Sequence, residues 1–502
     1  MLNQKDCRQI KNWLKNGLIL IFLSVMLWTA QTDCVNASES LARQKHILSK
    51  LTFGITSYER EQVEQMGIEA YIQSQLKPQS LTESAKVKQQ LSQLSTANKT
   101  SRQLQQYDFA LRKKVRNQQL AAAEERKIRR AIRKFNSKVD DESVDAHLAR
   151  AIYSHRQLQE VMVDFWFNYF NVNSLKGSVK LWINDYEDQI RSHALGNFSD
   201  LLLATAQHPA MLIYLDNKNN TAPESPAGKK HGHGLNENYA REVMELHTLG
   251  VEGGYSQDDI ISLARIFTGW GIDARGSKGN ENGFIFHQHR HDQQDKVFLG
   301  HRIAANGVKE GEQALQILAN HPATAQHISY KLAQYFVADN PPQSLVDRLA
   351  KSFLNSRGNI AIVLDTLIHS QEFNDPQYFG QKFKTPYQYL VSLVRMGEIK
   401  QPTFKRIRGM MFQLSMPIYR CPTPDGYDNT QATWLNPHAM LQRTSLATAI
   451  SNGVLNKDNL IEIQQLEQNM GAMSASTKEV LLKTHPRLRV ALMLGSPEAM
   501  YR

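Results

Sequence analysis

Apolar residues at helical spacing impose the strongest constraint on how this chain folds. In the stretch from Gly234 to Ile260, Tyr239, Val243 and Leu246 recur at the period of an α-helix and share one side of it. Acids, an arginine and a histidine occupy most of the other positions. Similar apolar spacing recurs from residue 143 to the C-terminus. The sequence therefore predicts a mainly α, multi-helical globular protein.

Capping residues set the limits of the helices in this stretch. Asn236 is a favourable N-cap, and Gly250 suits the left-handed position that follows a helix. Ser256 with Asp259 predicts a capping box for a second helix, which Gly269 ends. We therefore expect helix, tight turn, helix. Further along, alternating residues predict one small β-hairpin near 283–300.

The N-terminus resembles a signal peptide. Four basic residues precede the apolar run from Gly17 to Ala30, and "VNA" then offers small residues for cleavage after Ala37. An uncleaved anchor and a lipid-modified Cys34 are the alternatives. We expect residues 1–37 to be the signal and the protein to be exported: periplasmic, cell-envelope or secreted. Membrane contact is expected only through an uncleaved signal.

Loss of residues 1–37 leaves a single cysteine, Cys421, so no internal disulfide can form. Apolar burial must stabilise the fold, and 502 residues permit two or three regions with cores. We predict an N-terminal helical region over 38–142, a central one over 143–300 and a C-terminal one over 301–502. The net charge changes from +11 to 55 − 46 = +9. This favours an anionic polymer or a polysaccharide as partner, and we expect no nucleic acid.

Much of that charge lies in residues 107–138, which contain no Gly or Pro and many good helix formers. A sparse apolar stripe runs through this basic segment. It has two interpretations: a surface that binds an anionic polymer or membrane, or a solvated amphipathic helix that packs along one thin face.

The polar face of the first capped helix has two interpretations as well. Glu237, Arg241 and Glu245 form a ladder of alternating charge, which stabilises a helix without any catalytic role. Alternatively, Glu242 or Glu245 is a general base or ligand held by Arg241. His247 lies at the margin of the apolar face and is a further catalytic candidate.

A second group of candidates lies in "HQHRHD". On a strand, His287, His289 and His291 would share one face, and imidazoles beside a carboxylate suit zinc or a similar metal. A hydrogen-bonded pair of His291 and Asp292, structural or acid–base, is the alternative. The sequence identifies no cofactor.

Several motifs together resemble a known family. They are "FWFNYF", "HPAMLIYLDN", "NENYAREVMELHTLGVEGGYSQDDIISLARIFTGW", "HDQQDKVFLG", "HPATAQHISYKLAQYFVADNPP" and "WLNP". Over roughly Ala42 to Leu446 the chain closely resembles the bacterial family catalogued as domain of unknown function 1800. The resemblance implies an exported, largely helical protein, without an established reaction, whose members are often encoded beside an exported sulfatase-like family.

The resemblance also bears on individual residues. The family pattern retains the equivalents of His291, Asp292 and Lys296, so His287 and His289 are additions. Its usual Trp-x-Asn-His-Phe reads here as Trp166, Asn168, Tyr169 and Phe170, with Tyr169 in place of histidine.

Three functions remain open at this stage. The first is a hydrolase or lyase for an envelope or extracellular polymer, in which the helix acids face His291 and Asp292 across a cleft. Trp166, Trp270 and Trp434 would then stack on sugars, with Asn168 and Lys296 also binding substrate. The second is a non-catalytic scaffold that partners a sulfatase-like protein. The third is a metal- or haem-dependent oxidoreductase using His247 or His291.

Overall fold

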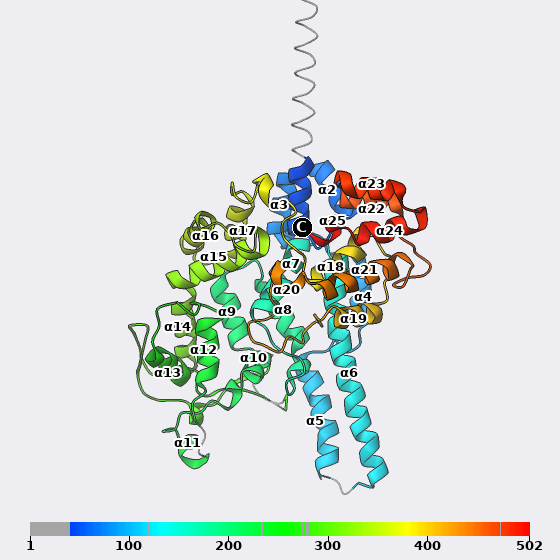
Figure 1. Cartoon of the computed structure of the whole chain (residues 1–502). Coiled ribbons are helices and arrows are strands. Elements are labelled where there is room, and N and C mark those ends of the chain that lie inside the picture. The colour runs from blue at the N-terminus through cyan, green and yellow to red at the C-terminus, as the bar shows by residue number, and fades with distance from the viewer. Residues whose placement is uncertain (1–40, 118–119, 232–233, 274, 277–281, 472) are drawn as a thin grey trace, which may run out of the picture. The chain divides into compact units, whose positions relative to one another are not determined.

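The helical spacing of the sequence produces a structure made chiefly of helices (Figure 1). The computed structural model describes residues 41–117, 120–231, 234–273, 275–276, 282–471 and 473–502. The expected signal peptide, residues 1–37, lies outside the described residues. Contacts divide the chain into Met1–Leu48, of which only the helical residues 41–48 are described, and Ser49–Arg502. The helices from Ser57 onward, the sheets and the cavities of this protein lie in the second unit, Ser49–Arg502.

Within the described residues, 24 α-helices and two small sheets confirm the mainly α prediction. The helices are α2 (Ser57–Met66), α3 (Ile68–Leu76), α4 (Ala85–Ser92), α5 (Ser101–Asn117), α6 (Ala122–Tyr153), α7 (Gln157–Tyr169), α8 (Ile183–His193), α9 (Phe198–Ala206), α10 (Pro209–Tyr214), α11 (Pro226–His231), α12 (Glu237–Glu245), α13 (Gln257–Ile266), α14 (Val308–Ala319), α15 (Pro322–Phe336), α16 (Gln343–Asn355), α17 (Ile360–Ile368), α18 (Pro386–Met396), α19 (Phe404–Gln413), α20 (Gln431–Trp434), α21 (Pro437–Ser451), α22 (Ile463–Met470), α23 (Ala475–Lys483), α24 (Pro486–Leu494) and α25 (Pro497–Met500).

The β-structure differs from the single hairpin expected near 283–300. Strand β1 (Trp270–Ile272) pairs antiparallel with β2 (Phe284–Phe286), with Trp270 opposite Phe286. Strand β3 (Lys296–Phe298) pairs with β4 (His301–Ile303). The two strands within 283–300 thus belong to different sheets. The hairpin of β3 and β4 overlaps the expected range, whereas the sheet of β1 and β2 was not expected. Residues 288–290 form a 3₁₀ turn between the two sheets.

The capped helix pair follows the prediction closely. The Asn236 side chain accepts a hydrogen bond from the Tyr239 backbone at 3.1 Å and begins α12. Gly250 adopts a φ of 80°, which favours glycine in the turn. Ser256 and Asp259 form the expected capping box of α13. The local sequence therefore determines both helix starts.

The core contains a helix that is buried on most of its surface. Helix α7 packs against α3, α6 and α8, and ten of its thirteen residues are buried. The Trp166 ring is fully buried, and its indole N–H donates to the Ala194 carbonyl at 3.1 Å. This packing fixes the position of every side chain that α7 carries.

The basic segment forms a helical hairpin instead of one helix. Helices α5 and α6 lie side by side and together form an arm (Figure 1), and residues 118–119 between them are not described. Residue 142, where a region boundary was expected, lies inside the continuous helix α6. Among the described residues, no helix is both long and apolar enough to cross a membrane.

Gly311 provides a test of the packing between α14 and β1. A Cβ there would come within 2.1 Å of the Trp270 ring, and such overpacking costs about 1–3 kcal/mol. We expect Gly311→Ala to lower the free energy of unfolding by about that amount in a denaturant titration. The matched control is Gly409→Ala in α19, where no atom lies within 4 Å. That variant should be neutral or stabilising, and equal losses in both would contradict the packing argument.

Candidate functional site

The acids of α12 form ordinary surface contacts. Arg241 pairs with Glu245 at 3.3 Å, and its guanidinium also donates to Gln257 at 3.0 Å. Glu237 accepts from the same Gln257 at 2.8 Å instead of pairing with Arg241. Glu242 has a different environment. Burial raises the pKa of its carboxyl group, and the nearby charges of Glu245 and Asp425 add to that shift.

His291 and Asp292 belong to a separate buried network. His291 is held through both ring nitrogens, by the Thr268 carbonyl at 2.9 Å and by Glu310 at 2.9 Å. Lys296 donates to Glu310 at 2.6 Å, and both side chains are fully buried. Asp292 forms a two-point contact with Arg265. The charged and polar groups of this network are therefore paired through hydrogen bonds and ion pairs. Because Lys296 lies on β3, Arg265 on α13 and Glu310 on α14, the network joins these three elements.

The structure does not bring the predicted sites together. No contact among the described residues joins Glu237, Arg241 or Glu245 to His291 or Asp292, and neither group lines the cavity described below. Lys296 is enclosed by its ion pair and faces no open space. The shared cleft on which the first hypothesis depended is therefore replaced by two satisfied networks.

The predicted metal ligands His287, His289 and His291 do not share a strand face. Residues 288–290 form a 3₁₀ turn, which directs the three rings differently. His287 and His289 contact each other with ring centroids 5.7 Å apart, whereas His291 points to Glu310. Within the described residues, no group of three or more His, Cys, Asp and Glu side chains is arranged to hold a metal ion.

The three tryptophans predicted to stack on sugars lie in the interior. Trp166 and Trp270 have no exposed surface, and Trp434 is 9% exposed. The Trp434 indole donates to the Asp428 carbonyl at 2.7 Å. This burial does not fit the prediction that the rings stack on sugars, because each ring packs inside the protein: Trp166 on α7, Trp270 on β1 and Trp434 on α20.

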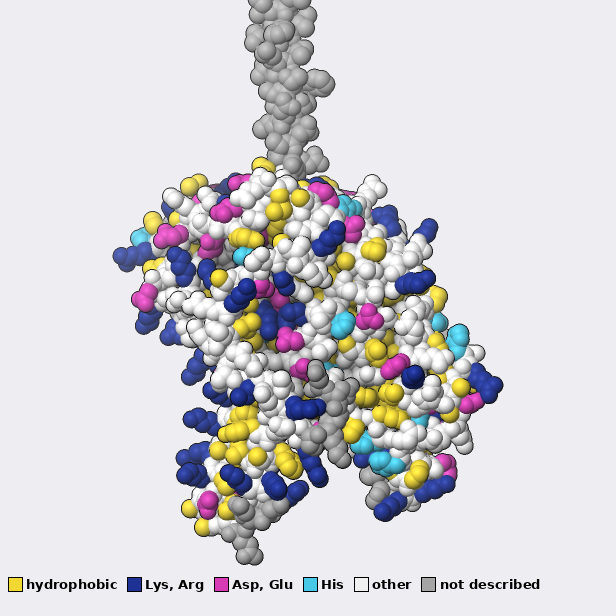
Figure 2. Space-filling model, turned by 180° about the vertical axis from the view of Figure 1, so that it is seen from behind, with side chains coloured by type: hydrophobic (Ala, Val, Ile, Leu, Met, Phe, Trp, Pro, Cys, Tyr) yellow, Lys and Arg dark blue, Asp and Glu magenta, His cyan; other side chains and the backbone are white. Residues whose placement is uncertain are grey.

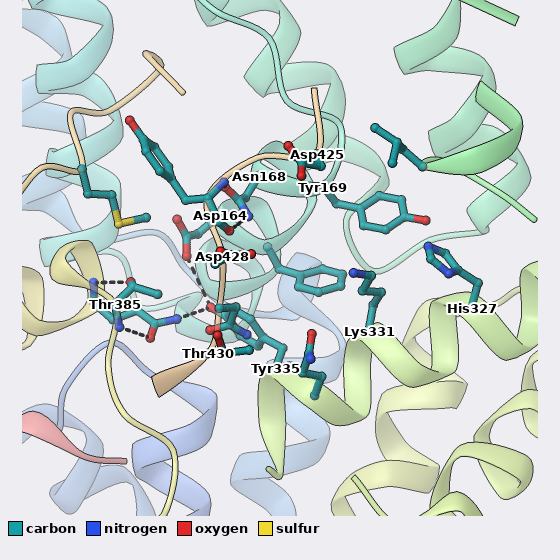
Figure 3. A pocket seen from close by; sticks show the side chains of 17 residues that line it. Asp164, Asn168, Tyr169, His327, Lys331, Tyr335, Thr385, Asp425, Asp428 and Thr430 are labelled. Atoms are coloured by element: carbon teal, nitrogen blue, oxygen red, sulfur yellow. Dashed lines mark hydrogen bonds between the residues drawn. The ribbon is translucent and has the colours of Figure 1, made fainter. Parts of the chain in front are cut away.

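A different region contains a polar cavity, which the sequence did not single out (Figure 3). It has a volume of about 220 Å³. A smaller cavity of about 40 Å³ adjoins it and shares Asp164, Asn168, Met416 and Tyr427. Helices α7 and α15 and the loop 425–430 supply most of the polar lining, which consists of Asp164, Asn168, Tyr169, His327, Lys331, Gln334, Tyr335, Thr385, Gln388, Asp425, Tyr427, Asp428, Asn429 and Thr430.

Asp164 is the carboxylate at the centre of both cavities. It lies on α7 between apolar residues, and the Tyr335 hydroxyl donates to it at 3.3 Å. Burial raises the pKa of Asp164 to about 6, although His147, Arg502 and Tyr335 oppose the shift. A carboxyl with this pKa changes protonation near neutral pH, which suits a general acid or base.

A histidine held by a buried carboxylate lies at the inner end. His147 lines the smaller cavity together with Asp164, and its Nδ1 lies 2.8 Å from Glu187. Burial alone would raise the pKa of Glu187, but His147 and Arg191 outweigh burial and hold that pKa well below its usual range. Glu187 is thus a fixed anion that orients the imidazole, as carboxylates orient histidines in acid–base sites.

Two asparagines of α7 and its C-terminal end hold the loop that carries the other acids. The Asn168 side chain donates to the Tyr427 carbonyl and accepts from the Tyr427 N–H, both at 2.8 Å. Asn171 donates to the Thr423 carbonyl at 2.7 Å. Gly426, with a φ of 77°, packs so close to Asn168 that a Cβ would collide with it. Asn168 thus lines the cavity and also positions Asp425 and Asp428.

A larger hollow of about 430 Å³ lies elsewhere, between Tyr58, Tyr153 and Lys400. Its acids already have partners: Glu59 pairs with Arg395 at 2.7 Å, and Glu398 accepts from the Ser57 backbone at 2.7 Å. Because these groups stabilise the fold, the cavity around Asp164 is the better candidate site.

Only two sequence features could have indicated this cavity. Asp164 is a lone acid within the apolar run "VMVDFWF", where an unpaired charge is costly. The loop "TPDGYDN" carries two acids around a glycine. Nothing in the spacing links these segments, which lie about 260 residues apart.

The fold and site define a helical protein with a partly open, acid-lined cavity and a basic arm. The family model described as "Protein of unknown function (DUF1800)" matches residues 46–501, and the chain belongs to this family. No curated protein and no solved structure matches the chain.

The buried network around Glu310 gives a stability prediction. Lys296→Met removes the cation that faces Glu310 and leaves a buried carboxylate with one partner fewer, which typically costs about 3–5 kcal/mol. We expect a loss of that order in the free energy of unfolding, measured by denaturant titration. Arg302→Met, which removes an exposed pair with Asp295, should leave the midpoint nearly unchanged. A neutral Lys296→Met variant would show that the network is not structural.

Proposed function

We propose that this protein is an exported hydrolase or lyase that cleaves a carbohydrate polymer, with Asp164 as its general acid. One observation carries the proposal: a carboxyl with a pKa of about 6 lies in a polar cavity beside a carboxylate-held histidine. Polar side chains that converge on a concave cavity with a perturbed acid are typical of catalytic sites.

The charge of the cavity favours one class of substrate. Asp164, Asp425 and Asp428 contribute carboxyl groups, and Lys331 is the one lysine of the lining. His327 adds no positive charge near neutral pH, because burial lowers its pKa to about 4. A polyanion would be repelled here, so the cavity suits a neutral or amine-bearing sugar.

The roles follow from position. Asp164, protonated below about pH 6, gives its proton to the oxygen of the bond that breaks. Asp425 or Asp428, on the loop facing it (Figure 3), takes a proton from the attacking water. Gln334, Asn429 and Asn168 supply hydrogen bonds to hydroxyl groups. After each cycle the loop aspartate loses its proton to solvent, and Asp164, which borders the same inner cavity as His147, regains one from solvent.

The expected signal peptide supports the proposed location in the envelope or outside the cell, where such polymers occur. The small volume of the cavity admits one end or one unit of a chain at a time.

Asp164→Asn tests the proposal directly. The amide cannot donate a catalytic proton, so we expect activity to fall by about 10² to 10⁴-fold. The measurement is release of reducing ends from neutral, amino-sugar and anionic polysaccharides. In the unaltered protein, kcat/KM should fall as pH rises through about 6, since Asp164 then loses its proton.

The control is Asp200→Asn, which changes an exposed acid in the first turn of α9. This variant should retain full activity and the same pH profile. An active Asp164→Asn variant would overturn the proposal, and a rate that falls as pH drops below 6 would contradict the role of Asp164 as acid.

The α5–α6 arm favours a second, binding function. Lys and Arg side chains gather over it (Figure 2), and Lys113, Arg126, Arg130 and Arg133 are exposed. Such a surface attracts anionic polymers by long-range electrostatics. The arm would hold a polyanionic envelope glycan close to the cavity, or serve a scaffold role beside a sulfatase-like protein.

Charge reversal tests this binding surface. Replacing Arg126, Arg130 and Arg133 by Glu should weaken binding to an immobilised anionic polysaccharide at least tenfold. Binding by the unaltered protein should weaken between low salt and 0.15 M, where screening shortens to about 8 Å. Lys351→Glu with Lys405→Glu and Lys478→Glu matches the charge change away from the arm. Equal weakening by both triple variants would rule out a specific role for the arm.

A further inference from the structure

Three buried polar atoms beside the cavity have no hydrogen-bond partner among the described residues. They are the Tyr169 hydroxyl, His247 Nε2 and His327 Nε2. Tyr169 ends α7, His247 follows α12, and His327 lies on α15. Three segments that are distant in sequence thus place unsatisfied groups in one place.

The geometry brings these side chains into one cluster. The Tyr169 ring centroid lies 6.1 Å from that of His327 and 6.4 Å from that of His247. The Tyr169 hydroxyl points toward the His327 ring (Figure 3). Tyr169 is 8% exposed and His247 2% exposed. Folded proteins rarely leave one such group unpaired, so three together indicate a ligand.

The chemistry of the three groups suits a metal ion. Both imidazoles leave Nε2 without a partner among the described residues, so this nitrogen can bind a metal ion. Imidazole nitrogens bind copper, iron, nickel and zinc.

We propose that Tyr169, His247 and His327 bind one transition-metal ion, copper(II) or iron(III), at the wall of the cavity. Binding breaks the Tyr169 O–H bond and forms an oxygen–metal bond, and the released proton goes to solvent. A phenol binds as the phenolate, so a strongly acidic ion is required to displace its proton. Tyr169 and His327 line the cavity, so the remaining coordination positions face its interior.

Binding of copper(II) alone to the metal-free full chain tests the site. We expect one copper per chain, release of one proton per copper in unbuffered titration, and a visible phenolate-to-copper absorption band. Tyr169→Phe should abolish the band while leaving the fold intact, and His327→Gln should weaken binding about tenfold or more. His247→Gln should do the same. Thermal melting of each metal-free variant confirms that it is folded.

The control addresses the other histidine pair. His287→Gln with His289→Gln removes two contacting, partly exposed imidazoles and should leave the band and the stoichiometry unchanged. Copper binding that is lost in this double variant but kept in His327→Gln would overturn the proposal. So would binding without the phenolate band.

The metal site does not depend on the proposed reaction. Its readouts are stoichiometry, proton release and absorption, none of which requires turnover. A chain that binds copper but cleaves no polymer would refute only the proposed function, and an active chain that fails to bind copper would refute only the metal site.

Discussion

The candidate site depends on the burial of α7. Trp166 and Phe170 are fully enclosed, so the helix cannot rotate or slide without opening the core. That constraint holds Asp164 and Asn168, four residues apart, on the side of the helix that faces the cavity. Asp164 cannot turn toward bulk water, and burial therefore raises its pKa. The Asn168 side chain keeps its two hydrogen bonds to the Tyr427 backbone, and these hold Asp425 and Asp428 opposite Asp164.

Two histidine–carboxylate pairs in the fold have different physical roles. His291 and Glu310 are enclosed, and further partners use the remaining ring nitrogen and the second carboxylate oxygen. Such a closed network stabilises the packing of β3 and leaves no group for chemistry. His147 and Glu187 are equally buried, but the imidazole borders a cavity that also contains Asp164. Access to open space, and not the residue types, separates the structural pair from the candidate catalytic one.

Much of the fold could be predicted from local sequence, because helices are determined by spacing and capping. Asn236, Ser256 and Asp259 act at short range, and their contacts appear as expected. The candidate site could not be predicted in the same way. Asn168 meets Tyr427, and Asp164 meets Tyr335, only through tertiary packing over more than 170 residues. The charge patterns of α12 and of "HQHRHD" each lie within one short segment and can be recognised in the sequence. The cavity around Asp164 is formed by segments that are distant in sequence.

The two charged regions of the molecule limit what a single substrate could be. On the proposed function, the cavity would exclude polyanions because Asp164 and the loop acids face it, whereas the α5–α6 arm would attract them. A polymer that uses both must carry its anionic groups away from the unit that is cut. Screening at physiological salt limits electrostatic repulsion at the cavity and attraction at the arm to about 8 Å. The arm and the cavity can therefore act on different parts of one polymer chain. A glycan with alternating neutral and anionic stretches satisfies both requirements, and a uniformly charged polymer satisfies only the arm.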